Sequence, residues 1–343
     1  MQRSGAAVLA APDRRRVMSD ISHPARPASL VGSLTSKNQI VLVAVLAVLS
    51  VGISLAVAQF YSGANIIAIL RQTALVLVVA SGMTMLLITA EVDLSVGASI
   101  AFVGVVAMDV INRTNSVFLG ALAGILFGGA VGLVNGLIVT RLKVNSLIAT
   151  IGTMMILQGS VFLYSREAVQ NHHHIASFVD IGAGYVGPFP IPVIIAAAVF
   201  VASYILLRHT TRGRYLYAVG ANPKAARLSG LRTDQLKLFA FVVTGLLVGV
   251  AGLILVSLMN AGQPTAGRGF ELTVIASVIL GGTSLSGGRG TLTGTLLGVL
   301  VLKVIDNGII MLQWSQDLQM IVPGVVLIIA TWLDLVRRRA DAG

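Results

Sequence analysis

The run KLFAFVVTGLLVGVAGLILVSLM at residues 237–259 decides the fold class, because its first residue is the only charged side chain in it. An α-helix rises 1.5 Å per residue, so a run of this length crosses the roughly 30 Å hydrocarbon core of a membrane. Backbone polar groups in that core must pair within the chain, which favours helices throughout. This stretch is therefore predicted to be a transmembrane helix.

Runs of the same kind recur along the chain and predict an all-α membrane protein. We expect about ten transmembrane helices from hydropathy and helix length. They are placed at residues 39–60, 72–90, 95–112, 116–140, 146–164, 190–207, 237–259, 270–283, 291–312 and 317–336. The run at 270–283 is too short to cross alone. The segment 63–71, with Asn65 as its N-cap, is expected to lie at the interface before the second span.

These runs define three regions of the chain. A basic cytoplasmic tail is expected at residues 1–37, a single transmembrane domain at 38–336, and a basic cytoplasmic C-terminus at 337–343. Composition agrees, because 56% of the 343 residues are hydrophobic, 11% are charged and the mean hydropathy is +0.90. A soluble domain has about a quarter of its residues charged. The chain has no cysteine, which excludes disulfides and thiolate metal sites.

The basic residues orient the predicted bundle. With the N-terminus inside, Lys303 falls within a span, and the outer segments hold only Arg71, Arg113, Arg166 and Arg268. The remaining 19 of the 24 Lys and Arg residues lie in inner segments, as the positive-inside rule requires. They cluster between apolar runs with few aromatics among them. The net charge of +11 therefore indicates membrane topology, not nucleic-acid binding.

The longest loop between spans, residues 208–237, contains a short helix whose two ends are specified by sequence. Asn222 suits the N-cap, Pro223 the first helical position, and Gly230 the left-handed position after the helix. Two helical turns are too few to be stable alone in water, so this helix is expected to dock against another surface. It is either an ordinary capped turn or an element that passes force from a motor subunit to a pore.

The residues in and around this helix resemble the cytoplasmic loop of ribose-type ABC sugar permeases. The motifs that carry the resemblance are RYLYAVGAN at 214–222, AARLSG at 225–230, EVDLSVG at 91–97, QPTAG at 263–267 and LGGTSLSGGRG at 280–290. They occur in family order between residues 40 and 336. The resemblance implies an ABC importer permease fold of the ribose-permease type, a sugar-like solute, and a multi-pass protein of the bacterial inner membrane with cytoplasmic termini.

The same resemblance implies partners. A permease of this family pairs with a second copy or a paralogue, with cytoplasmic ATPase subunits, and with an extracytoplasmic solute-binding protein that contacts outer loops such as 165–189 and 260–269. ATP and Mg²⁺ belong to the ATPase, so no cofactor, catalytic residue or metal is expected on this chain. The short helix would be the coupling helix. Its expected ATPase-contacting residues are Asn222, Pro223, Lys224, Ala225, Ala226, Arg227, Ser229 and Gly230.

Three positions depart from the family pattern and put the identity of the solute in doubt. Glu91 stands where glycine is more frequent, Thr273 where an acidic residue is common, and Lys303 where a small uncharged residue is usual. Polar residues within or beside spans are the candidates for the translocation path. They are Asp93, Ser95, Glu271, Lys303, Asp306 and Asn307.

Two groups of these candidates have more than one interpretation. Lys303 and Asp306 share a helix face at i,i+3, so they form an internal pair that fixes packing, touch the solute, or relay protons. Asp93 and Ser95 either cap the helix that begins near residue 95 or contact the solute. Gly120, and the glycines that follow it every four residues, predict close helix packing, with a gating hinge as the alternative.

Several other patterns are not expected to carry function. The GAGYVG sequence at residues 182–187 has dinucleotide-type spacing but no preceding strand, and the glycines at 282–287 lack the Lys-Ser/Thr of an ATP-binding loop. Three consecutive histidines, 172–174, point in diverging directions and do not readily chelate one ion.

Two other classes of function remain as alternatives. A proton- or sodium-coupled secondary transporter would use Lys303, Asp306 and Glu271 as coupling charges. A membrane-embedded enzyme would need a metal or an acid–base cluster, which the sequence does not provide.

Overall fold

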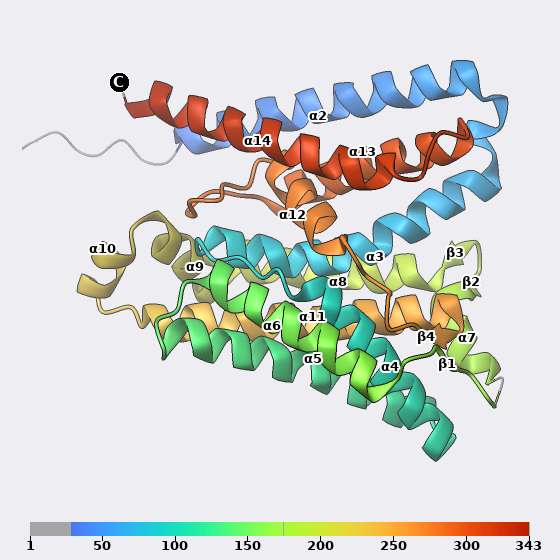
Figure 1. Ribbon diagram of the computed structural model, residues 1–343. Coiled ribbons are helices and arrows are strands. Elements are labelled where there is room, and N and C mark those ends of the chain that lie inside the picture. The colour runs from blue at the N-terminus through green and yellow to red at the C-terminus, as the bar shows by residue number, and fades with distance from the viewer. Residues whose placement is uncertain (1–28, 174, 343) are drawn as a thin grey trace, which may run out of the picture.

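The chain is described by a computed structural model that covers residues 29–173 and 175–342, and it is built almost entirely of helices (Figure 1). The helices are α2 (Ser29–Ala56), the 3₁₀ turn η1 (Ala58–Tyr61), α3 (Gly63–Ile88), α4 (Val96–Thr114), α5 (Val117–Thr140), α6 (Ser146–Tyr164), α7 (Ala176–Ala183), α8 (Ile191–His209), α9 (Thr211–Ala221), α10 (Pro223–Leu228), α11 (Thr233–Met259), α12 (Phe270–Leu280), α13 (Leu292–Met311) and α14 (Leu318–Ala342). Two antiparallel pairs of two-residue strands join them. They are β1 (Val169–Gln170) with β4 (Ala261–Gly262), and β2 (Tyr185–Val186) with β3 (Phe189–Pro190). The predicted all-α fold is confirmed.

Eight helices in the described residues are long and apolar enough to span a membrane. They are α3, α4, α5, α6, α8, α11, α13 and the part of α2 from Asn38 to Ala56. Two further apolar helices, Phe270–Leu280 in α12 and Leu318–Trp332 in α14, are shorter. The expectation that the run at 270–283 cannot cross alone is therefore confirmed, and the helical part of that run ends at Leu280.

The second predicted span was placed wrongly. Residues 63–71 are not a separate interfacial segment, because α3 runs without interruption from Gly63 to Ile88. Its N-cap is Ser62, whose hydroxyl accepts the backbone N–H of Asn65, so Asn65 is not the cap. Arg71 lies within this helix, and its guanidinium donates to the carbonyl of Ala183 at 2.6 Å.

Three other helix boundaries also differ from prediction. The helix α2 begins at Ser29, inside the predicted tail 1–37, and α14 continues to Ala342 through the predicted C-terminal tail. No proline interrupts either extension, and basic residues near a helix C-terminus are electrostatically favourable. The helix α11 begins at Thr233, with Asp234 in its first turn, where a negative charge is favourable. Residues 1–28 of the predicted tail lie outside the described residues.

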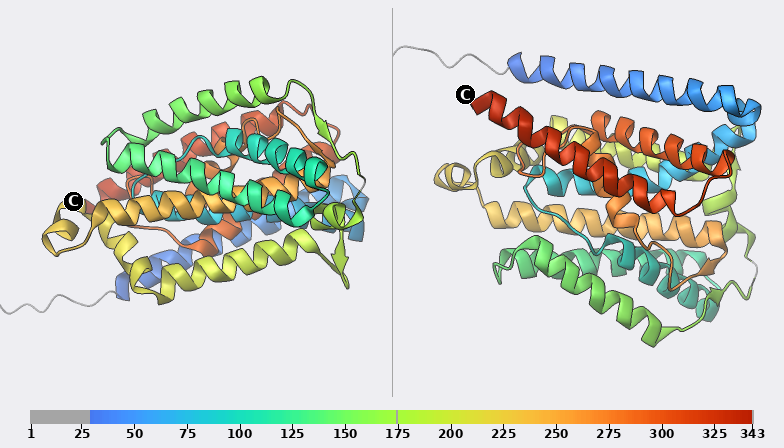
Figure 2. Two further views of the ribbon diagram at one scale, coloured as in Figure 1. Left: turned by 90° about the horizontal axis from the view of Figure 1, so that it is seen from below. Right: turned by 45° about the horizontal axis from the view of Figure 1, so that its top comes forward.

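The helix α3 is the centre of the bundle. It contacts α8 and α11 on one side and α12 and α13 on the other, and its residues from Val76 to Ile88 are buried. Figures 1 and 2 show α2 and α12–α14 grouped apart from α4–α6 and α11, with α3 between the groups. The described ends of α2 and α14 lie at the end of the bundle that carries α9 and α10, here called the α10 end. The opposite α7 end carries α7 and the four short strands.

Glycines allow α5 and α11 to pack backbone against backbone. A Cβ atom on Gly128 would lie 2.4 Å from the carbonyl oxygen of Gly245, and one on Gly132 would lie 2.4 Å from that of Phe241. Small residues permit such contact between helices in lipid, where no hydrophobic force draws them together. The predicted packing role of the glycine repeat is therefore confirmed.

Two extended segments interrupt the bundle between successive helices. The first break, residues 89–95, leads from α3 into α4, and the second break, residues 260–269, leads from α11 into α12. The helices after the breaks begin next to each other, because a Cβ atom on Gly97 would lie 2.4 Å from the carbonyl oxygen of Gly267. From there α4 runs to the α7 end and α12 runs to the α10 end.

The two breaks end in related sequences. DLSVGASI at residues 93–100 opens α4, and ELTVIASV at residues 271–278 opens α12. In each helix a serine hydroxyl donates to the carbonyl four residues earlier, Ser99 to Ser95 and Ser277 to Thr273. Since α4 and α12 run in opposite directions, the two halves of the bundle have inverted orientations, an arrangement found in many transporter folds.

Candidate functional site

The short helix α10 is capped at both ends as its sequence predicts. The Asn222 side chain accepts hydrogen bonds from the backbone N–H groups of Lys224 at 3.1 Å and Ala225 at 3.0 Å. Pro223 occupies the first helical position. Gly230 is left-handed (φ +83°), and the N–H of Leu231 closes the helix by donating to Ala226. This pattern is a Schellman C-terminal motif, so both predicted ends are confirmed.

The helix α10 projects from the bundle and is largely uncovered (Figure 1). Ala226 is its only buried residue, and Leu228 is 90% exposed. A helix of six residues has too few internal hydrogen bonds to persist alone, so its caps and its contacts with α9 and α11 hold it. The exposed face has the features expected of a docking element.

Its neighbour α9 connects α10 to α3 and to the loop after α12 at the α10 end of the bundle. Gly220 lies so close to the C-terminus of α3 that a Cβ atom there would be 1.7 Å from the carbonyl oxygen of Ile88. The same carbonyl accepts the N–H of Gly288 in the glycine-rich loop after α12, at 2.8 Å. Tyr217 donates its hydroxyl to Gly290 of that loop at 2.9 Å, and burial raises the pKa of Tyr217 to about 12. A movement of α9 must therefore act on α3 and on the loop after α12 together.

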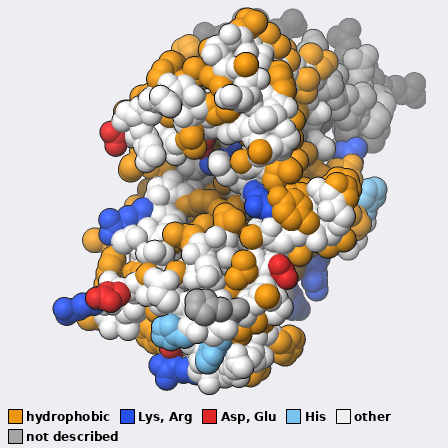
Figure 3. Space-filling model, turned by 90° about the vertical axis from the view of Figure 1, so that its right-hand side faces the viewer, with side chains coloured by type: hydrophobic (Ala, Val, Ile, Leu, Met, Phe, Trp, Pro, Cys, Tyr) orange, Lys and Arg blue, Asp and Glu red, His pale blue; other side chains and the backbone are white. Residues whose placement is uncertain are grey.

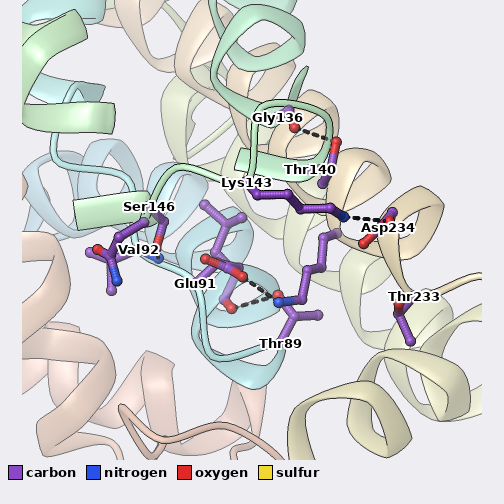
Figure 4. A network of polar contacts seen from close by, with 12 residues as sticks. Thr89, Glu91, Val92, Gly136, Thr140, Lys143, Ser146, Thr233 and Asp234 are labelled. Atoms are coloured by element: carbon purple, nitrogen blue, oxygen red, sulfur yellow. Dashed lines mark hydrogen bonds and ion pairs between the residues drawn. The ribbon is translucent and has the colours of Figure 1, made fainter. Parts of the chain in front are cut away.

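Polar contacts join α10 to the first turn of α11, and Figure 4 shows the neighbouring ion pair of Asp234 with Lys143. Arg227 donates to Thr233 at 3.1 Å and lies 3.7 Å from Asp234, which also pairs with Lys143 at 2.6 Å. Lys143 belongs to the loop between α5 and α6. These ion pairs are exposed and each contributes at most about 1 kcal/mol, so they guide position more than they stabilise the fold.

A more buried ion pair holds the first break. Lys237 of α11 donates to Glu91 at 2.5 Å, and the two side chains are 21% and 9% exposed. Glu91 is one of the three positions that depart from the family pattern, and the structure supplies its counter-ion. Lys237 is the first residue of a predicted span, and nothing in the sequence indicated that it pairs with Glu91.

Hydrogen bonds from hydroxyl and amide groups hold the rest of the first break in place. Asp93 accepts from the backbone N–H of Ser95 at 2.8 Å and from its hydroxyl at 2.6 Å, and the Asn135 amide donates to both Asp93 and Ser95. The N–H groups of Val92 and Leu94 donate to hydroxyls of α6. Asp93 thus accepts the backbone N–H of Ser95, the residue at which α4 is capped, whereas the Ser95 side chain makes no capping hydrogen bond to α4. Asn135, one amide in the apolar helix α5, was not identified from the sequence.

The second break is bonded differently. Gly267 of this break packs against Gly97 of α4, and Glu271 in the first turn of α12 places its Oε2 2.2 Å from the position that a Cβ atom on Gly97 would take. The electrostatic partners of this carboxylate are the backbone N–H groups of Gly269 and Glu271. Arg268 is exposed, and its guanidinium lies over the ring of Phe162, 6.0 Å from the centroid. Within the described residues neither Arg268 nor Glu271 forms an ion pair with another side chain.

The other three path candidates lie together and apart from the breaks. Lys303 and Asp306 form the predicted i,i+3 ion pair at 2.6 Å, both side chains being largely buried. Asn307 exchanges hydrogen bonds with Asn65 in the first turn of α3. The geometry therefore favours a packing role for this cluster, with its contacts to α3 and η1.

The α7 end carries the predicted outer loops. Figure 3 shows this face hollowed between two groups of helices, with hydrophobic side chains on its floor and Lys or Arg at its edges. Here the guanidinium of Arg71 stacks on Tyr185 at 4.8 Å. His173 contacts the carbonyl of Asn112, and His174 lies outside the described residues. No group of three His, Asp or Glu residues within residues 29–173 and 175–342 is placed to hold a metal ion.

Comparison with known proteins identifies a family over most of the chain. Residues 65–331 match the model of the family described as branched-chain amino acid transport system / permease component. The chain is 38% identical over 298 residues to the ribose import permease protein RbsC of Escherichia coli K12, covering 86% of this chain and 91% of the relative. It is 38% identical to RbsC of Bacillus subtilis, covering 80% and 86%, and 39% identical to the L-arabinose ABC transporter permease protein AraH of Azospirillum brasilense, covering 92% of each.

Proposed function

The chain belongs to this family of transport permease components, and from that premise we propose that it is the membrane subunit of an ATP-driven importer. Its solute is a monosaccharide or a sugar-like molecule, which moves into the cytoplasm while ATP is hydrolysed on a separate subunit. The relatives named for ribose and L-arabinose support this class of solute. The chain itself has a transport role and binds no cofactor.

The observation that carries the proposal is the capped, exposed helix α10 and its route into the bundle. The face around Leu228 docks on the ATPase subunit. Closure of the ATPase pair moves α10 together with α9, to which it is directly connected. Because α9 contacts its neighbours closely at Gly220 and Tyr217, its movement displaces them. The movement then reaches α3 and the loop after α12, which meet at the first break, where Gly287 lies against Ala90. The proposed ATPase contacts are the exposed residues Asn222, Pro223, Lys224, Ala225, Arg227, Ser229 and Gly230. Ala226, also expected from the sequence, is buried and packs α10 against the chain instead.

Docking of α10 on a cytoplasmic ATPase fixes the orientation of the chain in the membrane. The α10 end and both termini face the cytoplasm of a bacterial cell, and the α7 end faces outward, where a solute-binding protein docks. This places most Lys and Arg residues on the inner side. A second copy of the chain, or a paralogue, pairs with it in the inner membrane.

Reconstitution into vesicles with the ATPase and the binding protein tests the proposal. Ala225→Asp places a charge on the docking face of α10, and Gly230→Pro removes both the left-handed residue and the N–H that donates to Arg227. We expect each variant to lower ATP-dependent uptake at least about tenfold, equivalent to a loss of about 1.4 kcal/mol of coupling. Arg113→Gln, which alters an exposed pair far from α10, is the control and is expected to keep wild-type uptake.

A secondary transporter is the rival function. It would use Lys303, Asp306 and Glu271 to couple solute to protons or sodium. The mutual pairing of Lys303 with Asp306 leaves little role for them as exchanging charges. Uptake by the purified chain alone, driven by an ion gradient and insensitive to both α10 variants, would replace the proposal with this rival.

A further inference from the structure

One asparagine fastens residues 165–173, here called the β1 loop, to the end of α4. The Asn112 side chain donates to the carbonyl of Gln170 at 2.8 Å and accepts the backbone N–H of His172 at 3.1 Å. The backbone carbonyl of Asn112 contacts the His173 ring at 2.9 Å. Three contacts from a single residue therefore hold the β1 loop on α4.

The β1 loop is also fastened to the second break. The strands β1 and β4 pair antiparallel, with Gln170 opposite Ala261. Beside them, the buried side chain of Asn171 donates to the side-chain oxygen of Asn260 at 2.9 Å. Backbone and side-chain hydrogen bonds thus join two segments that lie 89 residues apart in the sequence.

The backbone conformation of Asn260 places its side chain at this junction. Asn260 ends α11 in the left-handed region, at φ +52°, which asparagine adopts more readily than most residues. Next along the break, Gly262 packs on α4, where a Cβ atom would lie 2.8 Å from the carbonyl oxygen of Gly104. The end of α11, the second break and α4 therefore meet where the β1 loop is attached.

A small apolar cluster, separate from the main core, packs the same segments together. Its buried members are Met108 and Ile111 of α4, Phe178 of α7 and Val256 of α11, and Val169 of β1 packs against them. Close-packed interiors have low compressibility, so they transmit a displacement from one segment to the next. The hydrogen bonds and this cluster together make one packed unit at the α7 end.

The second break leads from this unit to the α10 end of the bundle. It continues into α12, which ends at Leu280 and is followed by the glycine-rich loop. In that loop Gly290 accepts the hydroxyl of Tyr217, and Gly288 donates to the carbonyl of Ile88. One short helix thus connects the packed unit at the α7 end to the loop that α9 contacts.

From these contacts we propose that Asn112, Asn171 and Asn260 are positioning residues that make the β1 loop and the second break move as one body, here called the outer clasp. A solute-binding protein that docks on the β1 loop displaces the second break with it, and α12 carries the displacement to α9 and α10. The clasp thereby links docking on the outside to ATP hydrolysis on the inside. This inference rests on the proposed import function, to which it adds a route that begins at the outer face.

A disulfide tests whether the clasp moves as one body. Gln170 and Ala261 are cross-strand partners, and the Cα atoms of such partners lie about 4.5–5.5 Å apart, a separation that a disulfide accepts. The chain has no cysteine, so Gln170→Cys with Ala261→Cys introduces a single pair. We expect this pair to cross-link on oxidation of the purified chain, and the oxidised complex to keep wild-type uptake.

Two results of the cross-linking would overturn the clasp. Failure of the pair to cross-link would contradict the pairing of β1 with β4. Uptake that is lost on oxidation and returns on reduction would show that the two segments separate during transport.

Side-chain variants test whether the clasp carries the signal. The triple variant Asn112→Ala, Asn171→Ala and Asn260→Gly removes the side-chain hydrogen bonds, while glycine keeps the left-handed conformation at position 260. Two paired residues are too few to hold the strands alone. Asn115→Gly is the matched control, because Asn115 ends α4 at φ +53° and its side chain makes no hydrogen bond among the described residues.

The measurement uses vesicles that contain the complete complex. ATP hydrolysis is measured with and without binding protein loaded with D-ribose or L-arabinose, together with uptake of the same sugars. We expect the triple variant to lose at least about fivefold of the stimulation by binding protein, the lower limit of typical coupling between sites. ATP hydrolysis without binding protein should stay at the wild-type rate, which a general packing defect would not permit. The oxidised Gln170→Cys and Ala261→Cys pair, added to the triple variant, should restore the stimulation, and a reductant should abolish it again.

The outcomes separate this inference from the proposed function. If the wild-type complex imports a sugar and the triple variant is stimulated as strongly as Asn115→Gly, the clasp carries no signal and the import function stands. If elution or thermal unfolding shows that the triple variant is misfolded, Asn112→Ala alone replaces it, and wild-type stimulation of that variant overturns the proposal. If the wild-type complex shows neither uptake nor stimulation, the import function fails and the role of the clasp fails with it.

Discussion

The first and second breaks stand in corresponding places in the two halves of the bundle, yet their surroundings differ. In the first break, Glu91 is paired with Lys237, and Asp93 is bonded to Ser95 and Asn135. In the second break, Arg268 is exposed over Phe162, and Glu271 in the first turn of α12 has only backbone partners among the described residues. One acidic residue opens each following helix, but only Asp93 is tied to side chains of other segments.

This difference indicates a division of roles. Extended backbone at membrane depth persists where its polar groups are satisfied by protein or where it lines a water-filled space. The first break meets the former condition, so it acts as a fixed anchor near the α10 end. The second break leaves the Arg268 side chain exposed, so we expect it to be the more water-accessible of the two.

The largest difference between the breaks should appear in folding stability. Asp93→Leu removes the acceptor of the Ser95 N–H and hydroxyl, and of one of the two hydrogen bonds that the Asn135 amide donates, at a cost of about 3 kcal/mol. Glu271→Leu, the matched change just after the second break, should cost less than about 1 kcal/mol, because no other side chain in the described residues depends on Glu271. Thermal unfolding of the purified variants in detergent measures both. Equal losses of stability would remove the distinction between the two breaks.

A smaller effect is expected from the ion pair of the first break. Lys237→Met leaves Glu91 as an uncompensated, mostly buried charge and should destabilise the fold by about 2 kcal/mol, less than for a fully buried pair because Lys237 is partly exposed. The double variant Glu91→Gln with Lys237→Met should recover most of that loss. A double-mutant cycle with no coupling between the two positions would show that the pair does not hold the break.

The smallest effect is expected from the hydrogen bond that joins α9 to the loop after α12. Tyr217→Phe removes one hydrogen bond to Gly290, worth about 1 kcal/mol. The raised pKa of Tyr217, about 12 in the folded chain, also predicts a direction with pH. The unfolded chain ionises this phenol near pH 10 and the folded chain does not, so its stabilising contribution is full below pH 10 and is lost between about pH 10 and 12.

Ultraviolet titration of the tyrosinate band provides the measurement. The wild-type chain should contain a tyrosine that ionises near pH 12, and Tyr217→Phe should lack that step. A titration curve unchanged by the substitution would mean that Tyr217 is not held as the structure describes.

The sequence predicted those features that depend on neighbouring residues. Hydropathy placed the long helices, and the local signals of Asn222, Pro223 and Gly230 specified both ends of α10. The i,i+3 spacing predicted the pairing of Lys303 with Asp306. The continuous helix α3 was missed because residues 63–71 were placed at the interface and the span was begun after Arg71, whereas the Arg71 side chain bonds to the carbonyl of Ala183.

Local sequence patterns could not predict contacts between segments that are distant in the chain. Lys237 meets Glu91 only after α3 and α11 pack together, and Asn135 meets Asp93 only once α5 lies beside the first break. Arg268 was counted as an outer-loop residue from its position between spans. The contact of its neighbour Gly267 with Gly97 of α4 could not be inferred from the sequence.

Water accessibility at the two breaks tests the account most directly. The chain has no cysteine, so single substitutions Arg268→Cys in the second break and Leu94→Cys in the first report on one position each. In vesicles that contain the chain, a membrane-impermeant methanethiosulfonate reagent should modify Cys introduced at 268 rapidly. Position 94 should stay unreactive. Equal rates at the two positions, or no reaction at 268, would contradict the difference between the two breaks.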